Sequence, residues 1–220
     1  MKRNIIQTRD GSTTIQIEEW DECYHSRFGA IQEAQHVFIK NGLSLFENSS
    51  ISILEIGFGT GLNAFITFLE SKKLNQIIDY TGVEAYPVSP EEVQLMNYVP
   101  ELNAEKESAV FVKMHECNWE EPIAMREDFV FTKRKQFFAA IDDVETFDLI
   151  YFDAFGFDVQ PELWSTAIFQ KMHDALKPKG VLVTYAARGV VKRSMKEVGF
   201  TVEKLEGPPG KREMFRARKG

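Results

Sequence analysis

The chain has 220 residues, which predicts one domain because domains contain about 150 residues on average. Its composition, 44% hydrophobic, 12% aromatic and 27% charged, is that of a folded globular protein and excludes a disordered chain. The net charge of −7 is uneven: from Arg188 onward ten basic and four acidic residues give +6, which leaves −13 on the first 187 residues. This asymmetry fits a polyanionic partner at one end of the fold and, equally, a solvated terminal surface.

Neither a membrane span nor a metal site is indicated. No window reaches about 18 consecutive apolar residues, and the N-terminus lacks the apolar core of a signal peptide. Cys23 and Cys117 lie 94 positions apart, without a Cys-x-x-Cys motif or clustered histidines. We therefore expect a protein of the reducing cytoplasm with neither zinc nor a structural disulfide.

The first forty residues predict a hairpin followed by a helix. Residues 5–17 alternate loosely around Asp10-Gly11, a dipeptide that favours tight hairpin turns. Arg27–Lys40 carries apolar side chains at helical spacing and ends at Asn41-Gly42, which is typical of a left-handed helix cap. We expect one domain over residues 1–220, of which this hairpin and helix, residues 1–42, form the N-terminal part.

The next segment alternates between strands and helices. Ile51–Ile56 predicts a buried strand followed by a helical pattern from Leu62, and Ile77–Val83 predicts a second buried strand. A helix follows that is capped by Ser89, with proline in its first turn.

Two short β-type runs, Val110–Met114 and Phe129–Thr132, come next, and we expect them to pair. The sequence does not decide which of them is the third core strand. Phe147–Phe152 predicts a fourth core strand that ends at Asp153.

The remaining segments are a helix over Leu163–Leu176, a strand over Val181–Tyr185, a helix over Val190–Val198 and a closing hairpin. Strands that alternate with helices predict an α/β fold. We expect a mostly parallel, doubly wound sheet with an antiparallel hairpin at one edge.

Ligands of such sheets bind beyond the carboxyl ends of the strands. There the first buried strand runs into Glu55-x-Gly57-x-Gly59-x-Gly61, where glycine lets the backbone turn tightly and approach a ligand. Glu84 ends the next strand, 23 positions after Gly61, a spacing at which a carboxylate can accept both hydroxyls of a ribose. These features fit either a nicotinamide dinucleotide or S-adenosylmethionine.

The spacing of the glycines favours S-adenosylmethionine. Dinucleotide-binding turns have the pattern Gly-x-Gly-x-x-Gly, whereas here the glycines are spaced two and two and follow Glu55. The pattern is similar to the first motif of class I methyltransferases, a Rossmann-like fold whose glycine loop holds the amino-acid end of S-adenosylmethionine.

Further motifs are more specific. They are Asp21-Glu22-Cys23-Tyr24-His25-Ser26, Gly29-Ala30 with Glu33, His36-Val37-Phe38, Leu54 to Asn63, Asp153-Ala154-Phe155, Gln160 to Trp164, Lys177-Pro178-x-Gly180, Thr184-Tyr185 and Gly210 to Met214. From about Arg9 to the C-terminus the chain resembles the methyltransferase domain of the bacterial enzymes that complete 5-methylaminomethyl-2-thiouridine at the tRNA wobble position. It departs from that family in the loop Phe155-Gly156-Phe157-Asp158, where Phe-Ala-Pro is usual.

The resemblance implies a cofactor, a substrate and partners. S-adenosyl-L-methionine would be the methyl donor, and the acceptor would be 5-aminomethyl(-2-thio)uridine at position 34, in the anticodon stem-loop of tRNA. Bifunctional members carry a flavin-dependent oxidase domain after the methyltransferase domain, and this chain ends near its expected start, like a stand-alone methyltransferase. A separate flavin-dependent oxidase is then expected to act upstream.

The resemblance implies that the N-terminal hairpin and helix, residues 1–42, cover the site, and further site residues follow from the motifs. Asp153 is the candidate catalytic residue, because a carboxylate can orient an amine and accept its proton; the alternative is a turn cap. The donor candidates are Glu55, Gly57, Phe58, Gly59, Thr60, Gly61, Asn63, Glu84, Ala85, Tyr86, Tyr24 and Ser26. The substrate candidates are Asp153, Phe155, Trp164, Arg188, Lys211 and Arg212, with Lys192 and Arg193 weaker.

Several points stay open in the sequence. Phe155 and Trp164 suit stacking on an unpaired base, but Trp164 is at least as compatible with the core, and the basic residues suit either phosphates or solvent. Gln136, Asp142 and Asp143 are alternatives for the adenine contact. The competing functions are a small-molecule N-methyltransferase and a methyltransferase-like binding module without catalysis.

Overall fold

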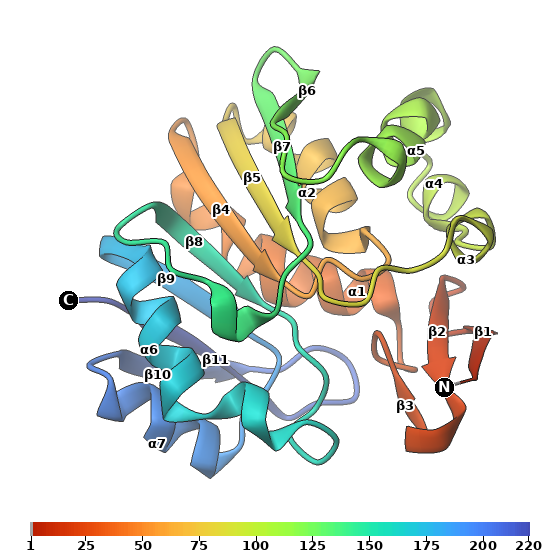
Figure 1. The fold of residues 1–220 in the computed structure, drawn as a ribbon. Helices are drawn as coiled ribbons and strands as arrows, with labels where there is room; N and C mark the ends of the chain where they lie inside the picture. Colours follow the sequence, from red (N-terminus) through yellow and green to blue (C-terminus); the bar gives the residue numbers. More distant parts are fainter. Residues whose placement is uncertain (1) are drawn as a thin grey trace.

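The computed structural model describes residues 2–220, which form an eight-stranded sheet with helices on both faces and a small three-stranded sheet beside it (Figure 1). The large sheet has the order β10-β11-β9-β8-β4-β5-β7-β6. Its strands are β4 (Ser50–Ile56), β5 (Ile77–Val83), β6 (Ile123–Arg126), β7 (Phe129–Arg134), β8 (Phe147–Phe152), β9 (Leu176–Thr184), β10 (Thr201–Glu206) and β11 (Glu213–Arg218).

Five neighbouring strands of this sheet, from β7 to β9, are parallel. The edges are antiparallel, with β6 against β7 at one end and the β10–β11 hairpin against β9 at the other. The predicted doubly wound sheet with an antiparallel edge hairpin is confirmed. From β4 the chain builds outward through β5 and β7 and then returns to β8 on the other side, so β4 and β8 flank the switch point where ligands of such sheets bind.

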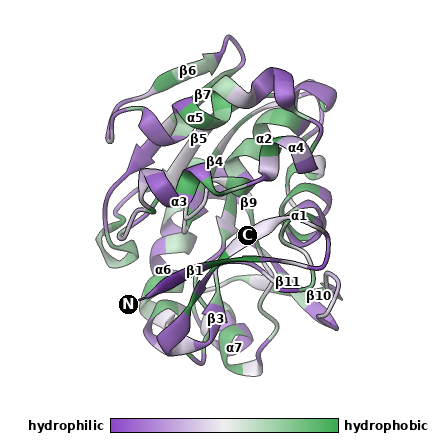
Figure 2. Ribbon diagram, turned by 90° about the vertical axis from the view of Figure 1, so that its right-hand side faces the viewer, coloured by the Kyte–Doolittle hydropathy of each residue, from purple (hydrophilic) through white to green (hydrophobic). Residues whose placement is uncertain are grey.

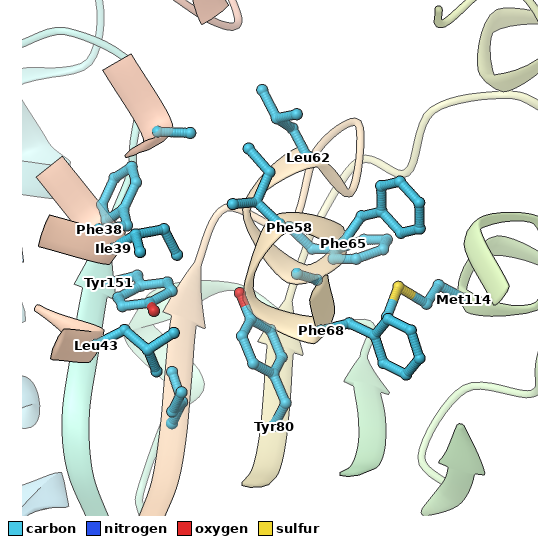
Figure 3. Packing of buried hydrophobic residues seen from close by; sticks show 14 of the residues in the cluster. Phe38, Ile39, Leu43, Phe58, Leu62, Phe65, Phe68, Tyr80, Met114 and Tyr151 are labelled. Carbon is cyan, nitrogen blue, oxygen red and sulfur yellow. The ribbon is translucent and has the colours of Figure 1, made fainter. Parts of the chain in front are cut away.

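Helices cover the two faces of the sheet because its strands are apolar on both sides. One face packs against α1 (Ala30–Ala34), the π-helical turn η2 (Gln35–Lys40), α2 (Leu62–Lys73) and α5 (Ser108–Glu116). Figure 3 shows this core, in which Phe65 and Phe68 of α2 meet Tyr80 of β5 and Met114 of α5. The other face packs against α6 (Thr166–Ala175) and α7 (Gly189–Glu197).

The N-terminal segment forms the small sheet. Strands β1 (Arg3–Gln7) and β2 (Thr13–Ile17) pair around Asp10-Gly11, as predicted, and β3 (Glu22–Cys23) adds to β2. A 3-10 turn, η1 (Glu18–Trp20), joins β2 to β3. The small sheet lies below α3 at the right of Figure 1 and in front of the large sheet in Figure 2, on the side where the carboxyl ends of β4 and β5 point.

The first helical segment ends at Lys40, as predicted, but differs from the prediction in its start and in its cap. It begins at Ala30 rather than Arg27. The expected left-handed cap at Asn41-Gly42 is wrong, since Asn41 has φ −96° and Gly42 has φ −121°. At the end of the wider π-helical turn, the side-chain amide of Asn41 donates to the His36 carbonyl at 2.8 Å. This bond satisfies a carbonyl at the helix end, so no left-handed residue is needed there. A 3-10 turn, η3 (Leu43–Phe46), leads on to β4.

Between β5 and β7 the prediction failed in part. Val110–Met114, expected as a strand, lies inside α5, because Phe111 and Met114 are one helical turn apart and both enter the core. Phe129–Thr132 is therefore the third core strand, as β7, and its antiparallel partner is β6. Before α5 come α3 (Pro90–Gln94), α4 (Tyr98–Glu101) and η4 (Glu105–Glu107). Ser89 caps α3 reciprocally with Glu92, as expected of a serine before proline.

The last part of the chain follows the predicted order with shifted boundaries. The helix expected over Leu163–Leu176 is divided into η6 (Pro161–Trp164) and α6, because the Ser165 hydroxyl caps α6 by accepting from the Ile168 N–H. Strand β9 begins at Leu176 rather than Val181, with an irregular register next to β8. A short turn, η5 (Phe138–Ala140), precedes β8. In residues 2–220 no helix is both long and apolar enough to cross a bilayer, and no cluster of metal-ligating side chains occurs.

Candidate active site

The glycine loop joins β4 to α2 at the switch point of the sheet. Gly57, Gly59 and Gly61 have φ of 90°, 48° and 75°, where side chains are disfavoured. Gly57 also has a packing reason, since a Cβ there would lie 2.5 Å from the carbonyl oxygen of Asp153. The N–H groups of Gly57 and Phe58 both donate to the Val83 carbonyl, so the loop is fixed between β5 and β8.

Glu84 follows β5 and holds the tip of the loop. Its Oε2 accepts the Gly59 N–H at 3.0 Å, and its Oε1 accepts the Tyr86 N–H at 2.8 Å. A carboxylate has about four lone-pair positions, so each oxygen can accept one further bond. The predicted role of Glu84 toward two ribose hydroxyls is therefore compatible with its place beside the loop.

Two exposed aromatic rings lie beyond Glu84. Tyr86 is 63% exposed and contacts Phe137, itself 62% exposed, edge to face at 5.9 Å. Phe137 was not predicted, although an aromatic residue just after β7 is a signal the sequence contained. Ala85 lies between Glu84 and Tyr86 and is partly exposed. Exposed rings beside a carboxylate that is predicted to bind a ribose suit the flat faces of an adenine.

Of the three adenine alternatives, one already has a partner. Asp143 forms an ion pair with Arg134, with 2.8 Å between its Oδ2 and the guanidinium nitrogen. Asp142 is exposed, and Gln136 is partly exposed. Gln136 and Asp142 thus stay open for the adenine amino group, and Asp143 is engaged.

A buried polar group lies under the glycine loop. Glu55 is fully buried, and within residues 2–220 neither of its carboxyl oxygens makes a hydrogen bond. Burial raises its pKa well above the usual range, although Tyr80 and Asn63 beside it favour the ionised form. The buried Oδ1 of Asn63 also lacks a partner in this part of the chain. Orphaned buried oxygens next to a glycine loop fit the ammonium end of S-adenosylmethionine, which supplies hydrogen-bond donors and positive charge.

Thr60 links the loop to the surrounding elements. Its hydroxyl accepts from Tyr98 at 3.0 Å and lies 3.4 Å from Nε2 of His25, while its carbonyl lies 3.1 Å from Nε2 of His115. Burial lowers the pKa of both histidines to about 4, so both are neutral at pH 7. Thr60 is 1% exposed, and Phe58 is 4% exposed. Both side chains support the loop, and their contact with the donor stays a prediction.

A cavity of ≈ 360 Å³ lies on the α5 side of the loop. Phe58 and Gly59 form one wall, and Val93 of α3 and Phe111 of α5 belong to the lining. Lys133 of β7 also lines it, and its Nζ donates to the His115 carbonyl and lies 4.6 Å from the Trp119 ring centre.

The N-terminal segment covers the other side of the loop. A Cβ built on Gly59 would lie 3.1 Å from the ring of Tyr24, which shows how closely the two approach. Burial raises the pKa of Tyr24 to about 12, and its ring contacts Phe155 edge to face at 5.0 Å. Ser26 lies further on, where its N–H donates to Glu33 at 2.9 Å. Residues from the predicted cover therefore reach the glycine loop, although Ser26 lies nearer the acceptor side.

Asp153 follows β8 and shares its face of the sheet with Glu55. Its N–H donates to the Ile56 carbonyl at 3.0 Å, and its Oδ2 accepts from the Asn63 amide at 2.8 Å. Burial, with a contribution from the charge of Glu33, raises the pKa of Asp153 to about 7; Asn63 and Lys211 oppose the shift. A carboxyl group that titrates near neutral pH beside a cofactor loop is suited to accept a proton.

Lys211 lies in this site and not on a free surface. Its Nζ forms an ion pair with Glu33 and lies 3.6 Å from the centre of the Tyr185 ring. Tyr185 in turn donates its hydroxyl to the Ala154 carbonyl at 2.7 Å. The Lys211 ammonium already has a carboxylate partner, so the contact of Lys211 with anticodon phosphates stays a prediction that requires this ion pair to open. Glu33 and Tyr185 stand in the motifs of the sequence, but the sequence did not assign either residue to the site.

The other substrate candidates separate into two groups. Trp164 is 1% exposed and donates its indole N–H to the Phe155 carbonyl at 2.8 Å, so the expected stacking of Trp164 on a base is wrong. Phe155 is partly exposed and contacts Trp20 at 5.6 Å. Arg188 forms an ion pair with Asp158, and Arg212 is exposed without an ion pair to any residue of the described chain.

The unusual loop Phe155-Gly156-Phe157-Asp158 is held by these residues. Trp164 supports its start, and Arg188 pairs with Asp158 and lies 5.6 Å from the Phe157 ring centre. The loop thereby places Phe155 against the N-terminal cover.

Known proteins are similar to this chain in sequence and in fold. Two bacterial proteins named tRNA 5-methylaminomethyl-2-thiouridine biosynthesis bifunctional protein MnmC are similar. The one from Marinomonas sp. (strain MWYL1) is 29% identical over 89% of this chain and 31% of its own length. The one from Nitrosospira multiformis is 30% identical over 88% of this chain and 33% of its own length. The chain thus spans about a third of the length of these relatives.

Solved structures share the fold. MnmC2 from Aquifex aeolicus superposes with a TM-score of 0.76 at 21% identity, covering 98% of this chain and 69% of that one. Spermidine synthase from Thermotoga maritima superposes with a TM-score of 0.60 at 15% identity, covering 99% and 68%. Residues 103–220 match the model of a family described as S-adenosyl-L-methionine-dependent methyltransferase. With more than half of its residues in that match, the chain belongs to this family of methyltransferases, and S-adenosyl-L-methionine is its methyl donor.

Proposed function

We propose that the chain methylates the primary amine of 5-aminomethyl(-2-thio)uridine at position 34 of tRNA and forms the 5-methylaminomethyl nucleoside. The observation that carries this proposal is the place of Asp153, which lies across the switch point from the glycine loop with a pKa of about 7. The names of the relatives support the wobble uridine as substrate.

The donor, when bound, supplies a methyl group on a sulfonium, and the chain's residues prepare the nitrogen that receives it. The acceptor arrives mainly as an ammonium, so one proton must leave before the nitrogen lone pair can attack. Asn63 holds one oxygen of Asp153 and leaves the other to orient an N–H and accept the proton. The nitrogen gains a methyl group and loses a proton, while the sulfonium becomes a neutral thioether.

The fold also supports the predicted division of the domain. The N-terminal sheet places Tyr24 over the glycine loop, and the turn before β11 places Lys211 beside Asp153. We infer that residues 1–42 act as the cover of a single methyltransferase domain. A tRNA substrate would place the reaction in the cytoplasm, after a step that makes the aminomethyl group, for which a separate flavin-dependent oxidase is the expected partner.

One observation favours the small-molecule alternative. Much of the positive charge of the C-terminal segment is neutralised within the fold: Arg216 and Arg218 both bind Glu203, and Lys204 binds Glu213. Paired side chains contribute less to phosphate binding than free ones. A small amine acceptor would need no basic surface.

The test is methyl transfer to tRNA isolated from cells that lack this protein. We expect the purified chain with labelled S-adenosylmethionine to convert 5-aminomethyl(-2-thio)uridine to its methylated form, as measured by nucleoside mass spectrometry. The same tRNA digested to nucleosides, and simple primary amines, are the comparison substrates. Methylation of free amines but not of tRNA would contradict the proposal and support the alternative, and donor binding without transfer to any acceptor would indicate a binding module.

A further inference from the structure

The ammonium of Lys211 lies in a pocket with the chemistry of a cation-binding site. Glu33 pairs with it, and the face of Tyr185 lies 3.6 Å away, well within the range of a cation–π contact. The Glu33 side chain is 8% exposed and that of Lys211 is 31% exposed, so the ammonium has given up much of its water. A carboxylate and an aromatic face are together a good receptor for any primary ammonium.

The carboxyl groups around this pocket carry more negative charge than Lys211 alone can neutralise. Glu22 of β3 and Asp153 after β8 face the same space as Glu33, and the charge of each of these three carboxyls acts on Tyr185. The cations near them are Lys211 and, further out, Arg27 and Arg188. The latter two are paired with Asp21 and Asp158, and His25 is neutral at pH 7. One lysine thus faces three carboxyls, which leaves room for a second positive charge.

The walls of the pocket do not depend on Lys211. Glu33 also accepts the Ser26 N–H at 2.9 Å, and Tyr185 is held through its hydroxyl by Ala154. Lys211 itself comes from the turn between β10 and β11, where its N–H donates to the Pro208 carbonyl at 2.9 Å. A flexible side chain on a turn can leave the pocket while the carboxylate and the ring stay in place.

We propose that Glu33 and the face of Tyr185 form the subsite for the primary ammonium of the acceptor, and that Lys211 occupies this subsite until the acceptor displaces it. The inference rests on the proposed function, because it needs an acceptor with a primary amine. It assigns Glu33 and Tyr185 to substrate binding, next to Asp153, which takes the proton. The displaced Lys211 then lies beside Arg212, where both are available to an anion on the substrate.

The first test compares two nucleosides that differ in one group, a charged ammonium in the first and a neutral hydroxyl in the second. Calorimetry in the presence of S-adenosylhomocysteine measures the binding of 5-aminomethyluridine and of 5-hydroxymethyluridine. We expect Lys211→Met to bind the amine about tenfold more tightly than the natural chain does, the change for a subsite that is open about one tenth of the time. Binding of the neutral nucleoside should change by less than about twofold, since it does not compete with an ammonium.

Two further variants control for charge and for the receptor. Lys204→Met removes a positive charge from the same hairpin, where Lys204 pairs with Glu213, and should bind both nucleosides as the natural chain does. Glu33→Gln should lose the preference for the amine. The inference is overturned if Lys211→Met binds the amine no more tightly than the natural chain, gains equally for both nucleosides, or binds neither. Lys211→Gln replaces Lys211→Met if the latter does not fold.

A second measurement separates displacement from simple repulsion between cations. Acetylation with reagent in large excess, read by mass spectrometry, reports how freely the Lys211 amine reacts. We expect 5-aminomethyluridine to raise the labelling of Lys211 several-fold and leave Lys196, exposed on α7, unchanged. Unchanged or reduced labelling of Lys211 at saturating nucleoside would show that it stays in the pocket. Failure of methyl transfer to tRNA would refute the proposed function and leave these binding results standing, so the two outcomes are distinct.

Discussion

The donor side and the acceptor side of the site are built differently. The main elements of the donor side come from one stretch of the chain: Glu55 lies in β4, the glycine loop follows β4, and Glu84 follows the adjacent strand β5. The acceptor side joins residues from across the chain, and its central ion pair, Glu33 with Lys211, connects positions 178 apart. Local motifs therefore show the first side in the sequence, whereas only the fold assembles the second.

The two sides also differ in their electrostatics. Glu84 on the donor side is matched by two backbone N–H groups, which leaves its charge satisfied before any ligand binds. Asp153 on the acceptor side has one amide donor, and burial and Glu33 raise its pKa to about 7. A carboxylate whose charge is matched by hydrogen-bond donors suits the binding of a ligand, while a carboxyl group with a pKa near neutral pH suits proton transfer. We expect substitutions on the two sides to separate binding from turnover.

The largest effect is expected at Asp153. Asp153→Asn keeps the size of the side chain but cannot accept the proton of the acceptor, so turnover should fall by about 10²–10⁴-fold. Affinity for S-adenosylhomocysteine should stay near that of the natural chain, because the donor side is unchanged. Single-turnover rates at saturating acceptor, with donor affinity from calorimetry, check both parts. Transfer at the natural rate would show that Asp153 is only a turn cap.

The same substitution should stabilise the fold at alkaline pH. The pKa of Asp153 is about 7 in the folded chain against 3.8 for the ordinary group, so the folded state binds more protons between these values. Stability is therefore lost as pH rises from about 4 to 7, and the loss is complete above 7. Asp153→Asn removes it, and we expect about 2–4 kcal/mol more stability at pH 8 and little change at pH 4.

Denaturant unfolding at the two pH values measures this difference. Asp158→Asn is the matched control, because Asp158 is an exposed carboxylate in the following loop. It should not stabilise the chain at pH 8. An equal gain for both variants would mean that general charge, and not the burial of Asp153, is responsible.

The sequence predicted some elements of the fold correctly and others wrongly, for physical reasons. Strand β5 agrees with its predicted bounds to the residue, and β4 to one residue, because buried β-branched runs bounded by polar turns have few other solutions. The segment Val110–Met114 failed because a short apolar run does not distinguish a strand from a buried helix until its partners are known. The helix ends before Asn41-Gly42 as predicted, but the left-handed cap expected there failed because a π-helical turn changes which carbonyl needs a partner.

The site shows the same limit. Glycine spacing and the carboxylate after β5 indicated the donor side, and the residue after β8 indicated Asp153. Glu33 stands in a motif with Gly29-Ala30, but the motif assigned it no role, since one glutamate on an amphipathic helix is usually solvated. In the structure it is 6% exposed and faces Asp153 and Lys211. Charge counting also overestimated the free positive surface, because pairing within the β10–β11 hairpin is not visible in composition.

On the donor side a smaller effect is expected from Glu84→Ala. It removes the acceptor for the Gly59 and Tyr86 N–H groups and for the ribose hydroxyls, so affinity for S-adenosylmethionine should weaken by about 1–3 kcal/mol. Turnover at saturating donor should change little by comparison with Asp153→Asn. Calorimetry measures the affinity, and Glu105→Ala, at an exposed glutamate of η4, is the control. Unchanged affinity would remove Glu84 from the donor site.

The smallest effect concerns the basic residues at the mouth of the acceptor side. Arg212 is exposed without an ion pair in the described chain, whereas Arg216 is held by Glu203 at 2.6 Å. If the substrate is tRNA, Arg212→Ala should raise its KM a few-fold and lower the slope of log KM against log salt by about one phosphate contact. Arg216→Ala removes an equal charge, but this charge is already paired with Glu203, so the KM and the salt slope should change less. Initial rates at several salt concentrations compare the two variants. Equal effects would mean that pairing with Glu203 does not withhold Arg216 from the substrate, and no effect of either would place the anionic contacts of the acceptor elsewhere on the fold.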